Sequence, residues 1–163
     1  MKTLLHVFAV LLLPLAALAQ TDVVAQGGII TSRGQGQALA ISSTVIGVNS
    51  GSGVTAGFLG AVSIVTPVLS TGTLAAGGTF PAGGAVSIVV PGVSGTQLVY
   101  NGTLTTGVTW VKSKLANGTA SYILSGSFTS PTGATGSFAL LTSNVGAGWS
   151  GVTTVTSLNM SVN

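Results

Sequence analysis

Few side chains in this chain could carry out acid–base or nucleophilic chemistry. The 163 residues include a single histidine, His6, a single acidic residue, Asp22, and no cysteine. General acid–base catalysis near neutral pH normally uses His, Glu, Asp, Cys, Lys or Tyr side chains. Because only one carboxylate is present, the carboxylate pair of a glycoside hydrolase cannot be assembled.

A serine–lysine or a tyrosine–lysine pair is the remaining catalytic possibility. Lys112 and Lys114 flank Ser113. A lysine acts as a base or nucleophile only when it is partly desolvated, which lowers its pKa. The strand pattern described below puts both lysines on an open face. The sequence therefore predicts a protein that is not an enzyme and that needs no metal or cofactor.

The first residues have the features of a secretory signal peptide. Lys2 supplies a positive start, residues 4–18 are mostly apolar, and Ala17-Leu18-Ala19 matches a small-residue cleavage site. We expect a signal peptide over residues 1–19, a mature chain beginning at Gln20, and a secreted protein, extracellular or periplasmic, for which attachment to a surface is left open. An uncleaved anchor is the rival interpretation, but a span needs about 20 apolar residues. Cleavage removes His6, which excludes a Ser-His-Asp triad and a histidine-containing zinc site.

Charge is nearly absent from the whole chain. Charged residues make up 3% and hydrophobic residues 46%, whereas an average soluble domain has roughly 25% charged residues. The net charge of +3 comes from scattered cations, and nucleic-acid binding needs them clustered. We therefore expect no nucleic-acid partner, and no transmembrane segment after the leader is removed.

The composition and the turn signals predict one all-β domain. Val and Thr favour strands, and Gly-rich turns recur along the chain as they do in sandwiches and barrels. We expect an antiparallel β-sandwich, small Greek-key or jelly-roll-like, with a small β-barrel as the alternative. Residues 20–60 are interpreted as Gly-rich strands and loops of the same domain, with 48–60 a loop or short edge strand. Residues 61–163 form the main antiparallel region.

A short repeat lies in the middle of the chain. Residues 61–67 (AVSIVTP) return as residues 85–91 (AVSIVVP). Two copies are too few for a solenoid, so we interpret them as two equivalent strands, each closed by a proline. One face of each strand should meet the core: Phe58, Val62 and Ile64 in the first, and Phe80, Val86, Ile88 and Val90 in the second.

The dipeptide Asn117-Gly118 predicts a β-hairpin, because a two-residue type I′ turn needs positive φ at both central positions. Such a turn pairs Lys114 with Ser121, and the side-chain period of two then separates the faces. The predicted core face holds Val111, Leu115, Ala120, Tyr122, Leu124 and Phe128. The predicted solvent face holds Trp110, Lys112, Lys114, Thr119 and Ser121.

Two further elements follow from similar patterns. Asn101-Gly102 is a candidate for a second hairpin turn. The last strand should turn Val152, Leu158, Met160 and Val162 inward, and Thr153, Ser157, Asn159 and Ser161 outward.

The leading functional hypothesis is a secreted, non-catalytic structural or surface-interaction domain. The net charge is too small to keep such molecules apart. We therefore expect self-association, or adhesion-like contact with an envelope, a matrix or a neutral polysaccharide. The alternative is a carbohydrate-binding module, in which sugars stack on exposed aromatic rings. Its candidate residues are Trp110, Lys112 and Lys114, with Trp149 and Tyr100 as helpers.

Two weaker patterns are also present. Thr103 and Thr105, like Thr154 and Thr156, place threonines on one face of a strand, which suits binding to ice or another flat surface. Asn101, Asn117 and Asn159 begin N-glycosylation patterns. The sequence leaves open whether they are modified, and it does not specify a ligand or an oligomeric state.

Overall fold

The computed structural model describes residues 20–33, 37–50, 53–91, 97–105, 107–146 and 148–163, and within them the side chains other than those of 53–58, 91 and 97–98. The predicted signal peptide and its cleavage site lie outside these residues. In the described ranges no helix has the length and apolar character needed to cross a membrane. The strands are β1 (Thr21–Arg33), β2 (Ala38–Ser50), β3 (Gly53–Val65), β4 (Thr71–Thr73), β5 (Gly77–Phe80), β6 (Gly83–Pro91), β7 (Gln97–Leu104), β8 (Val108–Lys114), β9 (Ala120–Thr129), β10 (Thr135–Thr142) and β11 (Val152–Val162).

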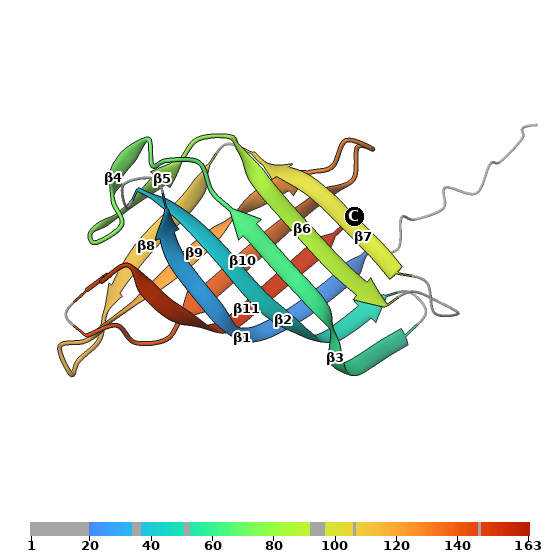
Figure 1. Ribbon diagram of the computed structural model, residues 1–163, viewed down its shortest axis with the longest axis horizontal. Helices are drawn as coiled ribbons and strands as arrows, with labels where there is room; N and C mark the ends of the chain where they lie inside the picture. The colour runs from blue at the N-terminus through green and yellow to red at the C-terminus, as the bar shows by residue number, and fades with distance from the viewer. Residues whose placement is uncertain (1–19, 34–36, 51–52, 92–96, 106, 147) are drawn as a thin grey trace, which may run out of the picture.

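The strands form a closed antiparallel barrel (Figure 1). The ring runs β1-β2-β3-β6-β7-β9-β10-β11 and returns to β1. Neighbours in the ring follow one another along the chain, so the connectivity is up-and-down. The all-β prediction is confirmed in its alternative form, the small barrel. The preferred Greek-key or jelly-roll sandwich is wrong, because β10 pairs with both β9 and β11 and closes the sheet on itself.

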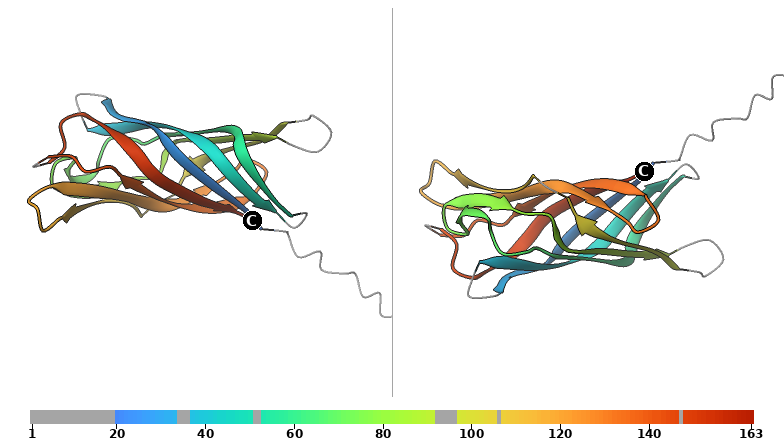
Figure 2. Two further views of the ribbon diagram at one scale, coloured as in Figure 1. Left: turned by 90° about the horizontal axis from the view of Figure 1, so that it is seen from below. Right: turned by 90° about the horizontal axis from the view of Figure 1, so that it is seen from above.

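A short extension continues the sheet at one end of the barrel. There β8 follows β7 along the chain and pairs with β9 on one edge and β5 on the other. β4 pairs with β5 as a small hairpin beyond it. Figure 2 shows this extension at the end of the barrel opposite the C-terminus. The β4–β5 turn of this extension contacts β8 and β9 at that end.

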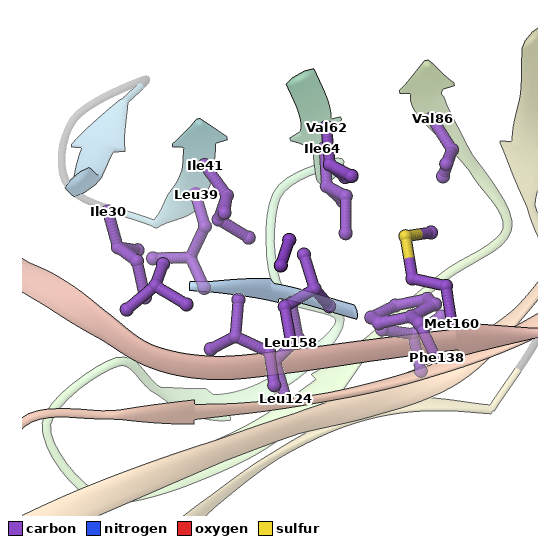
Figure 3. Packing of buried hydrophobic residues seen from close by; sticks show 14 of the residues in the cluster. Ile30, Leu39, Ile41, Val62, Ile64, Val86, Leu124, Phe138, Leu158 and Met160 are labelled. Atoms are coloured by element: carbon purple, nitrogen blue, oxygen red, sulfur yellow. The ribbon is translucent and has the colours of Figure 1, made fainter. Parts of the chain in front are cut away.

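The inside of the barrel is a continuous apolar core. Alternate residues of each strand point inward, and side chains from facing walls meet in the middle (Figure 3). Burying a Val, Leu, Ile or Phe side chain contributes roughly 1.5–3 kcal/mol, so this interior is the main source of stability. The largest fully buried side chains are Trp110, Tyr122, Phe80, Ile30, Leu39, Ile41, Ile64, Ile88, Leu104, Leu124, Leu140 and Leu158.

The repeated segments are two strands, as predicted, and the structure makes them neighbours. β3 and β6 pair antiparallel with Ser63 opposite Ser87. Val62, Ile64, Val86, Ile88 and Val90 are buried, which confirms the expected core faces of β3 and β6. Phe80 is also buried, but it lies on β5 and not on the strand of the second copy as predicted. The side chain of Phe58 lies outside those described.

The hairpin at Asn117-Gly118 exists, but its loop is one residue longer than predicted. The Gly118 amide donates to the Leu115 carbonyl at 3.0 Å, and Gly118 has φ +81°. This is a type I turn followed by a left-handed residue, the usual three-residue hairpin loop. Lys114 therefore pairs with Ala120 rather than with Ser121.

The one-residue difference moves the predicted solvent face of β8 inward. Trp110 is fully buried, whereas Val111 is 50% and Leu115 36% exposed. The assignment on β9 is confirmed for Ala120, Tyr122, Leu124 and Phe128, which are buried, but Ser121 is buried too. The faces predicted for Trp110, Val111, Leu115 and Ser121 are therefore wrong.

Asn101-Gly102 is not a turn. Both residues lie within β7, where a Cβ on Gly102 would sit 2.7 Å from the Thr129 carbonyl oxygen. The glycine here permits close approach of two strands rather than a reversal. Within the range 48–60, the described residues 48–50 and 53–60 are likewise not a loop or short edge strand, since they belong to the paired strands β2 and β3.

Bulges change the facing of two strands, β1 and β11. In β1 the register against β2 shifts between Gln26 and Ile29, and the buried positions change from Val23 and Ala25 to Ile30. In β11 the register shifts between Leu141 and Thr142 of its partner β10. Leu158, Met160 and Val162 are buried as predicted, but beyond the shift Thr153 is buried and Val152 is 53% exposed, contrary to prediction. A bulge adds one residue to one strand and so reverses which parity faces the core.

Candidate functional site

Three aromatic side chains gather at the extended end of the barrel. Trp110 on β8 stacks on Tyr122 of β9, with ring centroids 4.7 Å apart and planes 8° apart. Trp149, from the connection between β10 and β11, meets both rings edge-on at 5.5 and 6.1 Å. Stacked and edge-to-face pairs each add about 0.5–1.5 kcal/mol beyond area burial. We call Trp110, Tyr122 and Trp149 the aromatic cluster.

The polar atoms of the aromatic cluster hold the β4–β5 turn against the barrel. The Trp110 Nε1–H donates to the Leu74 carbonyl at 2.8 Å, and the Tyr122 hydroxyl donates to the Ala75 carbonyl at 2.8 Å. The same hydroxyl accepts from the Trp149 amide at 3.0 Å. Among the described residues no buried side-chain nitrogen or oxygen lacks a partner. The cluster thus closes the end of the barrel.

The connection after β10 is tied to the same end. The Val145 amide donates to the Ala120 carbonyl at 2.7 Å, and the Ala120 amide donates to the Gly146 carbonyl at 3.0 Å. The buried Thr142 hydroxyl accepts from the Tyr122 amide at 2.9 Å. These bonds place Trp149 over the aromatic pair.

The structure brings together three of the five predicted binding residues. Trp110 and Trp149 are in contact, and Lys112 Nζ lies 3.2 Å from the position that a Cβ on Gly148 would take. Lys112 and Trp149 are half-buried, and Lys114 is exposed near the hairpin loop. Tyr100 lies on β7, half-buried against the core, and does not belong to the aromatic cluster.

Trp110 cannot act as a stacking platform for a sugar, because none of its surface is exposed. Tyr122 and Leu74 complete this end of the barrel and were missed as members of the site. A three-residue loop at Asn117-Gly118 places Lys112 opposite Tyr122. Had that loop length been assumed, the sequence would have predicted Tyr122 as a member of the site. The sequence carries no comparable signal for Leu74.

The outer wall of the barrel offers a second candidate surface, made of small uncharged side chains. Its central row runs Ser42–Ser63–Ser87–Asn101 across β2, β3, β6 and β7. We call the outward residues of these four strands the neutral face: Ala40, Ser42, Thr44, Ala61, Ser63, Val65, Ala85, Ser87, Val89, Val99 and Asn101. It holds no ionisable group, and no member is larger than Val or Asn.

The opposite wall is different in character. A shallow depression of about 420 Å³ lies over β1, β10 and β11 and is lined in part by Asp22, Ser137, Asn159 and Ser161. Asp22 accepts a hydrogen bond from the Gln20 amide group at 2.8 Å. The described residues contain no group of three or more His, Cys, Asp or Glu side chains that could hold a metal ion.

Comparison with protein-family models, with curated proteins and with solved structures finds no match to this chain.

Proposed function

We propose that this protein is a secreted, non-catalytic contact domain that works through its neutral face, in structural or adhesion-like association with an uncharged surface such as an envelope, a matrix or a neutral polysaccharide. The observation that carries the proposal is the row Ser42–Ser63–Ser87–Asn101, with Ala, Val and Thr on either side of it. The predicted signal peptide supports export to the compartment where such surfaces are found.

Two energetic features of the neutral face favour contact. Immobilising a rotamer-rich side chain at an interface costs about 0.5–1.5 kcal/mol, and Ser, Ala, Val and Thr have few rotamers to lose. Desolvating an ion costs far more than desolvating a hydroxyl group, and this face presents no ions. Depletion of charge is also what distinguishes the core of a protein interface from the remaining surface.

The experiment adds one charge at the centre of the neutral face. Ser63→Lys places an ammonium group between Ser42 and Ser87 without disturbing the core, because Ser63 points outward. The matched control is Ser137→Lys, also an exposed serine, on β10 at the opposite side of the ring. Retention of each variant is measured on isolated cell envelope and on insoluble neutral polysaccharides.

We expect Ser63→Lys to weaken retention by about tenfold or more, since burying an unpaired charge costs several kcal/mol and 1.4 kcal/mol is already a factor of ten. Ser137→Lys should bind like the unmodified protein. Equal retention of both variants, or no retention of the unmodified protein on any uncharged surface, would contradict the proposal.

A carbohydrate-binding module remains a second proposal, with a different site. Its support is Trp149, which is half-buried and follows Gly148, the residue that lies beside the Lys112 ammonium group. In the same retention assay this function requires Trp149→Ala to abolish polysaccharide binding while Ser63→Lys leaves it intact.

A further inference from the structure

One strand of the barrel has an edge that is paired over only part of its length. β7 pairs with β6 from Gln97 to Leu104, but β9 contacts its other edge only at Thr103 and Leu104. Within the described parts of the chain, no strand pairs with that second edge over residues 97–102. This segment lies at the end of the barrel near the C-terminus (Figure 2).

The register shows which backbone groups face the open edge. The Thr105 amide donates to the Ser127 carbonyl of β9 at 2.9 Å, so Thr105 directs its polar groups away from β6. Because the strand period is two, the amides and carbonyls of Gln97, Val99 and Asn101 point the same way. Pro91 lies opposite Gln97 and has no N–H, so it cannot donate a hydrogen bond to Gln97. This agrees with a Gln97 whose polar backbone groups point away from β6.

In the described part of the chain, the open edge lacks three of the features that usually protect sheet edges: lysine, proline and a bulge. Proteins block such edges with lysine, proline, a bulge or a covering loop. Residues 97–107 (QLVYNGTLTTG) contain no charged residue and no proline, and β7 has no register shift against β6 in this segment. The Val99 side chain is 52% exposed beside the open backbone groups.

We propose that this edge pairs antiparallel with the same edge of a second copy of the protein, about a two-fold axis at Val99. The two-fold places Val99 opposite Val99, and Gln97 opposite Asn101, so every outward amide meets an outward carbonyl. A second copy fits because no like charges meet across the axis. The pairing joins two neutral faces into one wider sheet. The inference rests on the proposed contact function and names a partner for it.

The contact is small, so the association should be weak. Three outward residues per copy give about six backbone hydrogen bonds. The area buried falls below the roughly 1,200 Å² that marks stable complexes. We expect a dissociation constant above about 1 µM. The dimer should therefore form where the protein reaches a high local concentration, as it does on a surface.

A single engineered cysteine tests the geometry, because the chain has no cysteine of its own. Cα atoms of a hydrogen-bonded antiparallel pair lie about 5.5 Å apart, so Val99→Cys in two paired copies can be bridged by a short bis-maleimide. Ser137→Cys, exposed on β10, is the matched control. We expect Val99→Cys in the full chain to form covalent dimers at least about tenfold faster than Ser137→Cys.

Two further variants separate loss of pairing from loss of folding. Val99→Pro removes one outward donor and spares the β6 ladder, and Val99→Lys brings like charges together at the axis. Both should abolish concentration-dependent association in sedimentation velocity and leave the far-ultraviolet circular dichroism unchanged.

Equal crosslinking of Val99→Cys and Ser137→Cys, or association that survives Val99→Lys, would overturn the edge pairing. The retention assay tests the proposed contact function independently of the edge pairing. A monomeric protein that still loses retention with Ser63→Lys would refute edge pairing alone, and failure in both assays would refute both proposals.

Discussion

Replacing Trp110 with alanine removes the side chain that joins the β8–β9 wall to the β4–β5 turn. Trp110 has no exposed surface, stacks on Tyr122 and donates to the Leu74 carbonyl. Truncating a buried tryptophan costs about 3–5 kcal/mol, and leaving a buried carbonyl without its donor costs about 1–3 kcal/mol. Because these contributions overlap, we expect a loss of about 4–5 kcal/mol in the free energy of unfolding.

The assay is equilibrium unfolding in urea, followed by circular dichroism. The control is Val111→Ala on the same strand, because Val111 is the next residue and is 50% exposed. That substitution should cost less than about 1 kcal/mol. A domain is typically stable by only 5–15 kcal/mol, so Trp110→Ala should lie close to unfolding under conditions in which Val111→Ala is native.

The comparison of these two variants tests the register of β8 directly. A two-residue turn at Asn117-Gly118 would put Trp110 outside and Val111 inside. Comparable costs for the two variants, or a larger cost for Val111→Ala, would refute the three-residue loop and the inward position of Trp110.

Two other substitutions test local features of the fold. Gly28→Ala should cost about 3 kcal/mol or more in unfolding free energy, because Gly28 has φ +85° and a Cβ there would lie 1.9 Å from the Ser42 carbonyl oxygen. Gly27→Ala, with φ +65° and nothing within 4 Å of the new Cβ, should cost only about 1–2 kcal/mol; equal costs would argue against the bulge in β1. Tyr122→Phe should cost about 1–3 kcal/mol and speed hydrogen exchange at the Trp149 amide, because the hydroxyl bridges Ala75 and Trp149. Unchanged exchange there would show that Trp149 is held by other contacts.

Local patterns were sufficient for the core faces of β3 and β6 but not for the closure of the sheet. The alternation in residues 61–67 and 85–91 placed Val62, Ile64, Val86 and Ile88 in the core because a two-residue period needs no knowledge of distant partners. Sandwich and barrel strands share that period. The pairing of β10 with both β9 and β11 depends on long-range register, which the alternation does not encode.

The wrong face predicted for Trp110 has a clear physical origin. Asn-Gly favours both two- and three-residue loops, and a single added residue rotates every side chain of one strand to the other face. Tyr122 was correctly placed in the core because the alternation of apolar residues in β9 identifies its core face without reference to the turn. Trp110 was placed outside because its position was derived from the assumed turn. The bulge beside Thr142 misplaced Val152 in the same way.

The claim that the neutral face makes the contact is tested most directly by covalent footprinting of the protein on a retaining surface, compared with the free protein. A carbene label reports side-chain exposure residue by residue. The account predicts that labelling of β2, β3 and β6 falls on binding while the outward residues of β10 and β11, such as Ser137, stay fully labelled. Protection centred on β10 and β11 or on Trp149, with Ser63 and Ser87 still labelled, would contradict it.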